Sequence, residues 1–240
     1  MSPWWRDTIG TWYASGKPQL VSRVGRRGGK SSSLTRLAVV EAVYGEHHVP
    51  PGDIGVVAIV SARRTDAMER LRTIRAILDA LGIRYTEKAE SIELTGRGRS
   101  FVVFTASVAG VSGFTSIWVL LDEVAKMRDS DTGANPAAVV IGSIRPTMAT
   151  QKNARMVLSS SPMGLLDAHA DAYALGDTAY QMTAYAPSWV ANPTLTEEGT
   201  HALEPDEAVW SREFAAIPQA EAEASLVTAK AIDKCTRLAQ

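Results

Sequence analysis

The fold is decided by the stretch VSRVGRRGGKSS at residues 21–32, where an apolar, strand-like approach enters a glycine-rich turn. A helix-compatible run follows from Leu34. Glycines let backbone N–H groups converge on phosphate oxygens, and the lysine reaches the β- and γ-phosphates. The N-terminal end of the following helix favours the same anion. The stretch predicts a nucleotide-binding loop made of Gly25, Arg26, Arg27, Gly28, Gly29, Lys30, Ser31 and Ser32.

A second motif is the apolar run IWVLLDE at residues 117–123, which ends in two acids. It is too short for a typical helix and is typical of a buried central strand with carboxylates at its C-terminal edge. Ligands of open α/β sheets bind at that edge. We expect Ser31 and Asp122 to hold Mg²⁺, and Glu123 to orient and deprotonate the attacking water. Together the two motifs indicate a nucleoside-triphosphate hydrolase.

Composition sets the limits of this interpretation. The 240 residues are 45% hydrophobic and 21% charged, which suits one sizeable α/β domain, with or without a small appendage. A net charge of -1 does not indicate a polyanion partner. An arginine-rich group is equally consistent with a solvated helix face and a DNA-facing one; it consists of Arg63, Arg64, Arg70, Arg72 and Arg75. A lone Cys235 excludes an internal disulfide. Without an apolar signal or a spanning run, we expect a soluble protein with no membrane partner.

Strand-like and helix-like segments alternate along the chain. We expect strands at 19–24, 54–60, 117–123 and 155–159, a hairpin at 91–94 and 100–104, and helices at 34–43, 65–81 and 136–144. This order predicts a mainly parallel, right-handed α/β sheet flanked by helices, the P-loop NTPase fold of the ASCE, RecA-like kind. We divide the chain into an aromatic N-terminal segment (1–18), an ATPase core (19–186) and a C-terminal wrapping or linker segment (187–240).

The aromatic segment, with Trp4, Trp5 and Trp12, is interpreted as a cover for the core. Base stacking, or a contact of this cluster and Gln19 with an adenine ring, is an alternative for the same residues. The histidines lack helical metal-ligand spacing and are interpreted as surface or structural residues.

With these residues in hand, the chain resembles the ATPase domain of the large terminase subunit of tailed phages. The family's phosphate loop reads Arg-x-x-Gly-Lys-Ser/Thr without the early glycine, and Arg26 to Ser31 fits that form, with Val24 in the glycine's place. The pair Asp122-Glu123 and the strand-tip sequence SSPMGL at 160–165 resemble two further family motifs. The segment from Trp189 to Phe214 resembles the family's linker. The resemblance spans roughly residues 19 to 218.

The resemblance implies a Mg²⁺-dependent ATPase motor that translocates double-stranded DNA into a procapsid. Its implied partners are a portal protein and a small terminase subunit. It would form a homo-oligomeric ring when assembled and a monomer in isolation, in the host cytoplasm. Arg26 would sense or stabilise the γ-phosphate, and Ser160 and Ser161 would couple hydrolysis to movement.

The chain departs from the family in two respects. Full-length large terminases carry a nuclease domain with an aspartate cluster, and the tail to Gln240 lacks one, so we expect no nuclease activity. Many relatives carry an Arg-Gly pair before the acidic strand, where this chain has Ser112-Gly113. We therefore expect slow ATP turnover, because such an arginine acting in trans is worth about 10³–10⁵ in rate. The candidate substitutes are Arg97, Arg99, Arg128 and Arg145.

Two other functions remain open on the sequence. A two-lobed helicase shares the phosphate loop, the acidic strand and a serine-rich coupling motif, but it needs two tandem cores. A non-hydrolysing assembly module would keep the nucleotide-binding fold for structure alone.

Overall fold

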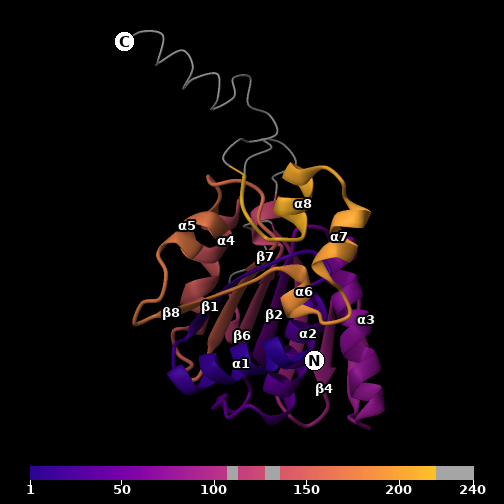
Figure 1. Cartoon of the computed structure of the whole chain (residues 1–240). Coiled ribbons are helices and arrows are strands. Elements are labelled where there is room, and N and C mark those ends of the chain that lie inside the picture. Colours follow the sequence, from indigo (N-terminus) through magenta and orange to yellow (C-terminus); the bar gives the residue numbers. More distant parts are fainter. Residues whose placement is uncertain (107–112, 128–135, 220–240) are drawn as a thin grey trace.

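The computed structural model describes residues 1–106, 113–127 and 136–219. Within these ranges, eight strands form one sheet in the order β3-β4-β5-β2-β6-β7-β1-β8 (Figure 1). The strands are β1 (Gln19–Val24), β2 (Gly55–Ser61), β3 (Tyr85–Lys88), β4 (Ser91–Leu94), β5 (Arg99–Thr105), β6 (Thr115–Asp122), β7 (Arg155–Ser160) and β8 (Gln181–Ala186).

The helices follow the strands in the predicted alternation. They are α1 (Pro3–Ser15), α2 (Lys30–Tyr44), α3 (Arg64–Ala80), α4 (Ala137–Ile144), α5 (Ala168–Ala174), α6 (Ser188–Ala191), α7 (Glu197–Leu203) and α8 (Glu207–Glu213), with short 3₁₀ turns η2 (Val124–Lys126) and η3 (Arg145–Met148). The helix predicted from Leu34 begins four residues earlier, because Gly29 turns the chain with φ 78° and the phosphate-loop lysine itself opens the helix.

The sheet is mainly parallel, as predicted. Strands β5, β2, β6, β7, β1 and β8 run in the same direction. The antiparallel part is confined to β3, β4 and β5, which includes the predicted hairpin. Because β7 lies between β1 and β6, Ser159 pairs in register with both Ser22 and Asp122. The carboxyl ends of these three strands therefore meet at one edge.

Two apolar layers hold the helices on the sheet. Alternating strand residues point to opposite faces, so Leu20 and Leu120 pack toward α1, α2 and α3. Their neighbours Val21 and Leu121 pack toward α4, with part of α5 at the margin of the cluster. The figure shows these helices on the two sides of the sheet (Figure 1). Both faces of the central strands β2 and β6 are therefore buried, in agreement with their unbroken apolar runs in the sequence.

The aromatic N-terminal segment folds as helix α1. Ser2 caps its first turn, with the Trp5 N–H donating to Ser2 Oγ at 3.4 Å, and Gly16 ends it in the left-handed region with φ 68°. Trp5 and Trp12 are completely buried in the core, as expected for a covering segment.

Two strands were not predicted. In β3 the exposure pattern shows no buried residue, so it lacks the alternation that marks a half-buried strand. In β8 polar and apolar residues are mixed, and the strand is fixed by parallel pairing with β1 along its whole length. No helix in the described part of the chain is long and apolar enough to cross a membrane.

Candidate nucleotide-binding and catalytic site

The phosphate loop joins the end of β1 to the start of α2. Arg27 and Gly29 adopt left-handed backbone angles, with φ 59° and 78°. The Gly28 N–H donates to the Gly25 carbonyl at 3.1 Å. A Cβ atom on Gly28 would lie 2.6 Å from Val24 Cγ1, so this position requires glycine. The loop thus has the tight turn that sequence reasoning expected, and Val24 packs against it in place of the early glycine.

Lys30 lies under the loop. Its Nζ donates to the carbonyls of Val24 at 3.0 Å and Gly25 at 3.2 Å, and lies 3.6 Å from Glu123 Oε1. Burial lowers the pKa of Lys30, and the carboxylate of Glu123 opposes this effect. The ammonium group therefore connects the phosphate loop to the acidic strand.

Ser31 and Asp122, the two predicted metal ligands, are in contact with each other. Ser31 Oγ donates to Asp122 Oδ2 at 3.1 Å, and Asp122 is 1% exposed. Arg70 Nε lies 3.1 Å from the same oxygen. Burial raises the pKa of Asp122, and the guanidinium of Arg70 opposes that rise.

Glu123 lies at the strand tip with φ 56°, a left-handed angle that is uncommon outside glycine and is concentrated at functional sites. Its Oε2 accepts from Ser160 at 3.4 Å and Ser161 at 3.3 Å, and lies 3.3 Å from Lys126 Nζ. Burial favours the protonated acid, but the ammonium groups of Lys30 and Lys126 outweigh it and lower the pKa of Glu123 to about 2. Glu123 is therefore ionised at neutral pH, as a proton acceptor must be.

The segment after β8 holds the outer side of the loop. The Arg26 N–H donates to the Glu213 carbonyl at 2.6 Å, and Ser188 Oγ donates to the Arg26 carbonyl at 2.5 Å. Arg26 Nε lies 3.1 Å from Glu213 Oε2, and its side chain is 60% exposed. Asn192 Nδ2 donates to the Arg27 carbonyl at 2.9 Å. We call residues 187–219, with these contacts, the linker clasp.

The site fits Mg²⁺ bound together with a phosphate ligand. No group of three or more His, Cys, Asp or Glu side chains able to hold a metal occurs in the described ranges. Magnesium in phosphate sites needs no such group, because it keeps several waters and takes one or two protein ligands plus substrate phosphates. The Ser31 hydroxyl and the Asp122 carboxylate supply that kind of donor set.

The structure brings most of the predicted site residues together at one sheet edge. Ser32 differs from the others, because its hydroxyl donates to the Gly29 carbonyl of the loop itself at 3.1 Å. Gln19 lies at the opposite end of β1 from the loop and donates to Gln181 at 2.8 Å, which removes it as an adenine contact.

Three of the arginines considered as trans-acting residues make hydrogen bonds within this chain. Arg97 and Arg99 donate to carbonyls at the end of α2, and Arg145 donates to Gln19. Ser112 and Arg128 lie outside the described residues.

Sequence reasoning missed four residues of this site. The sequence does not distinguish Arg70 from the other arginines of its helix, and its contact with Asp122 is evident only in the folded structure. Lys126 could have been found from its place three residues after Glu123 on a short turn. Trp5 donates from Nε1 to the Gly28 carbonyl at 2.7 Å, and Glu213 reaches the loop from more than 180 residues away. Such long-range contacts leave no local signal.

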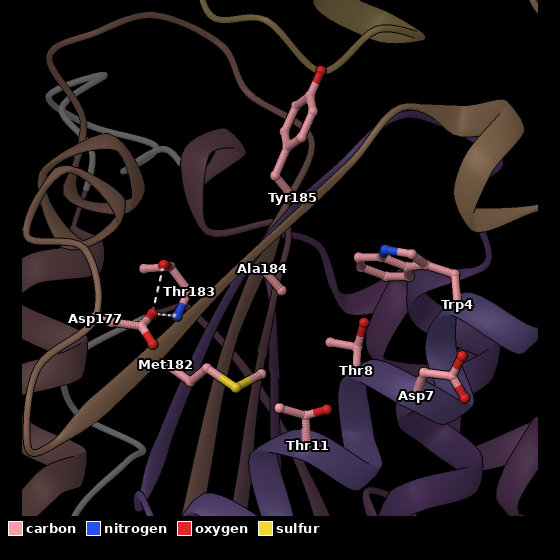
Figure 2. A pocket seen from close by; sticks show the side chains of 9 residues that line it. All are labelled: Trp4, Asp7, Thr8, Thr11, Asp177, Met182, Thr183, Ala184 and Tyr185. Atoms are coloured by element: carbon pink, nitrogen blue, oxygen red, sulfur yellow. Dashed lines mark hydrogen bonds between the residues drawn. The ribbon is translucent and has the colours of Figure 1, made fainter.

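Two hollows lie near these elements. A groove of about 490 Å³ runs between α1 and β8 (Figure 2) and contains no phosphate-loop residue. Within it Asp177 accepts from the Thr183 N–H at 2.7 Å and the Thr183 hydroxyl at 2.8 Å, which caps part of the free edge of β8. A second pocket, of about 270 Å³, adjoins the loop and is lined by Met1, Ser2, Trp5, Gly29, Ser32, Ser33, Arg36, Ala191 and Asn192.

Comparisons with known proteins agree on the fold. No family model and no curated protein matches the sequence. Among solved structures, a variant of the large terminase ATPase domain of Thermus phage P74-26 is 16% identical with a TM-score of 0.63, covering 84% of this chain and 89% of that one. The HK97 bacteriophage large terminase is 15% identical with a TM-score of 0.66, covering 89% of this chain and 50% of that one.

A large terminase from a thermophilic bacteriophage, in complex with ADP, is 15% identical with a TM-score of 0.69 and covers 90% of this chain and 51% of that one. The chain thus spans about half the length of the full-length large terminases that it matches. The chain therefore has the P-loop NTPase fold, in the form found in the ATPase domains of phage large terminases.

Proposed function

We propose that this chain is the ATPase motor of a phage DNA-packaging machine, a Mg²⁺-dependent ATP hydrolase that translocates double-stranded DNA. The observation that carries the proposal is the joined set Lys30, Ser31, Asp122 and Glu123. Ser31 contacts Asp122 at 3.1 Å, and Lys30 lies 3.6 Å from Glu123. The terminase-like fold supports the choice of motor.

ATP binding begins with an exchange of partners at Lys30. Its ammonium group donates to two loop carbonyls and pairs with Glu123. Phosphate oxygens offer a stronger, charged acceptor, so Lys30 turns toward the β- and γ-phosphates. The loop N–H groups and the start of α2 hold the same phosphates. The pocket lined by Ser32, Arg36 and Asn192 leaves room for the ribose and base.

Ser31 and Asp122 would hold Mg²⁺, which when bound neutralises the charge that develops on the phosphates. Once Lys30 has turned to the phosphates, Glu123 loses one of its two ammonium partners. The ionised carboxylate then orients a water molecule and accepts its proton at Oε1 or Oε2.

Coupling follows from the contacts of the same carboxylate. Ser161 Oγ donates to Glu123 Oε2 at 3.3 Å. Ser160 Oγ lies 3.4 Å from the same oxygen, makes its shorter hydrogen bond to the Ser161 carbonyl at 2.7 Å, and accepts from the Ala125 N–H at 3.2 Å. A change at Glu123 therefore alters the hydrogen bonds at the tip of β7. Arg26, held by Glu213 in the linker clasp, is the proposed sensor of the γ-phosphate.

The proposal extends to the assembly. Portal protein and small terminase subunit are the proposed partners, in a ring of identical subunits in the host cytoplasm. We expect no nuclease activity from this chain, and supercoiled plasmid that stays uncut in Mn²⁺ would agree with that expectation. A helicase-like ATPase and a non-hydrolysing assembly module are the alternatives.

The test measures phosphate release from Mg²⁺-ATP with no DNA, with duplex DNA and with single-stranded DNA. The proposal expects slow release that duplex DNA stimulates. Stimulation by single-stranded DNA alone, with strand separation, would favour the helicase. Tight ATP binding with no phosphate release under any of the three conditions would favour the assembly module.

A further inference from the structure

Arg70 differs from the other arginines of α3. Arg64, Arg72 and Arg75 form ion pairs with acidic partners at the surface, and their side chains are 68%, 69% and 41% exposed. The Arg70 side chain is only 18% exposed, and its Nε donates to Asp122 Oδ2 at 3.1 Å. Among the ion pairs of α3 in the described residues, the one formed by Arg70 is the one that involves Asp122, the proposed metal ligand.

The packing of α3 on the sheet determines where the Arg70 side chain lies. Residues three and four apart share one face of a helix. Ala67 and Ile74, which stand three before and four after Arg70, are both buried against the sheet. Arg70 therefore lies on the inner face of α3, and its head group meets the carboxyl end of β6.

Asp122 Oδ2 accepts two hydrogen bonds, one from Arg70 Nε and one from Ser31 Oγ, each at 3.1 Å. A third group stands beside the carboxylate. Ser61 pairs in register with Asp122, is 1% exposed, and has a hydroxyl with no hydrogen-bond partner among the described residues. Buried hydroxyls normally find a partner. An ordered water of a bound metal would supply one here.

We propose that Arg70 is a positioning residue that neutralises Asp122 until Mg²⁺ takes its place. A buried carboxylate requires a positive partner, and Arg70 supplies one that stays charged at any physiological pH. Two cations on one carboxylate repel each other, so Mg²⁺ and Arg70 compete for Asp122. Arg70 and Ser31 both donate to Asp122 Oδ2, so a released guanidinium would stay near the phosphate site, where a nucleotide supplies a replacement anion. Metal binding therefore depends on nucleotide binding. This inference rests on the proposed Mg²⁺-nucleotide function.

The first experiment measures binding of Mn²⁺ alone, without nucleotide, by electron paramagnetic resonance. We expect Arg70→Gln to bind Mn²⁺ about 10- to 100-fold more tightly than the wild type, the range for removing one charged hydrogen bond. Arg72→Gln, an exposed arginine on the same helix, is the matched control and should leave the affinity unchanged. Adding Asp122→Asn to Arg70→Gln should abolish the gain. A folded Arg70→Gln protein that binds Mn²⁺ no more tightly than the wild type overturns the inference.

A second measurement needs no variant. In ¹⁵N NMR of the wild type, the Arg70 Nε–H resonance should shift and exchange faster with solvent when Mg²⁺ and ADP are added together. ADP with a chelator should leave it unchanged. An Nε–H signal unaffected by bound Mg²⁺-ADP would mean that the ion pair persists beside the metal, which contradicts the inference. Failure of the wild type to bind any nucleotide would refute the proposed function, whereas the Mn²⁺ experiment would still decide the role of Arg70.

Discussion

The hydrogen bond from Trp5 to the phosphate loop gives the sharpest test of how the N-terminal helix supports the site. Trp5 Nε1 donates to the Gly28 carbonyl at 2.7 Å, and the residue is completely buried. Trp5→Phe keeps the aromatic ring but leaves this buried carbonyl without that donor. The loss of one partner of a buried hydrogen bond costs about 1–3 kcal/mol.

The chain offers a matched control in the same helix. Trp12 is also completely buried, but its Nε1 has no hydrogen-bond partner among the described residues. Each indole packs edge-to-face on an aromatic neighbour, Trp5 on Trp4 at 4.8 Å and Trp12 on Tyr13 at 5.2 Å. Trp12 also lies under the guanidinium of Arg155, 5.4 Å from the ring centroid. Trp12→Phe therefore removes the same volume without breaking a hydrogen bond.

We expect Trp5→Phe to be less stable than Trp12→Phe by about 1–3 kcal/mol. For a chain of this length, each 1 kcal/mol corresponds to about 2–4 °C in Tm. Urea and thermal unfolding followed by circular dichroism measure the difference. A fluorescent ATP analogue should also bind about tenfold more weakly to Trp5→Phe, since a shift of about 1.4 kcal/mol in the loop is tenfold in Kd. Equal destabilisation by both variants, with equal nucleotide affinity, would refute the reasoning.

Two further predictions concern the linker clasp and pH. A Cβ on Gly25 would overlap Phe214 O and Ser188 Oγ, so Gly25→Ala should destabilise the protein by about 1–3 kcal/mol in urea unfolding. Gly10 lies in helix α1, and a Cβ atom added there would have no atom within 4 Å, so Gly10→Ala should stabilise the protein by about 0.5–1 kcal/mol. If the two variants were equally stable, the tight contact between Gly25 and the linker clasp would be contradicted. His169 donates from Nε2 to the Ser22 carbonyl at 3.1 Å, and burial lowers its pKa to about 4 from 6.5. The unfolded chain therefore takes up this proton first as pH falls, and the free energy of unfolding should drop between pH 6.5 and about 4. His169→Gln should flatten that slope by up to about 1.4 kcal/mol per pH unit. Identical slopes in the variant and the wild type would contradict the assignment.

The sequence predicted those segments whose conformation depends on residues close to them in the chain. The glycine-rich turn and the apolar run ending at Asp122 and Glu123 were found because turn chemistry and strand burial act within a few residues. The edge strands β3 and β8 were missed because pairing with a neighbour, rather than apolar alternation, fixes them. Helix α1 was interpreted only as a covering segment, although Ser2, Pro3 and Gly16 are ordinary helix start and stop signals.

The candidate site divides in the same way. Lys30, Ser31, Asp122 and Glu123 were predicted from two short motifs, and the fold places them in contact. The contact of Arg70 with Asp122 could not be predicted, because a charged residue on an amphipathic helix is usually solvated and only the packing of α3 turns this one inward.

The proposed hydrolysis depends above all on Glu123 as the residue that activates the attacking water. The most direct measurement compares Mg²⁺-dependent phosphate release and ATP-analogue binding in the wild type and in Glu123→Gln, with and without duplex DNA. We expect Glu123→Gln to bind the nucleotide still but to release phosphate at least about 100-fold more slowly, the lower bound for losing a general base. Phosphate release by Glu123→Gln at the wild-type rate would contradict it.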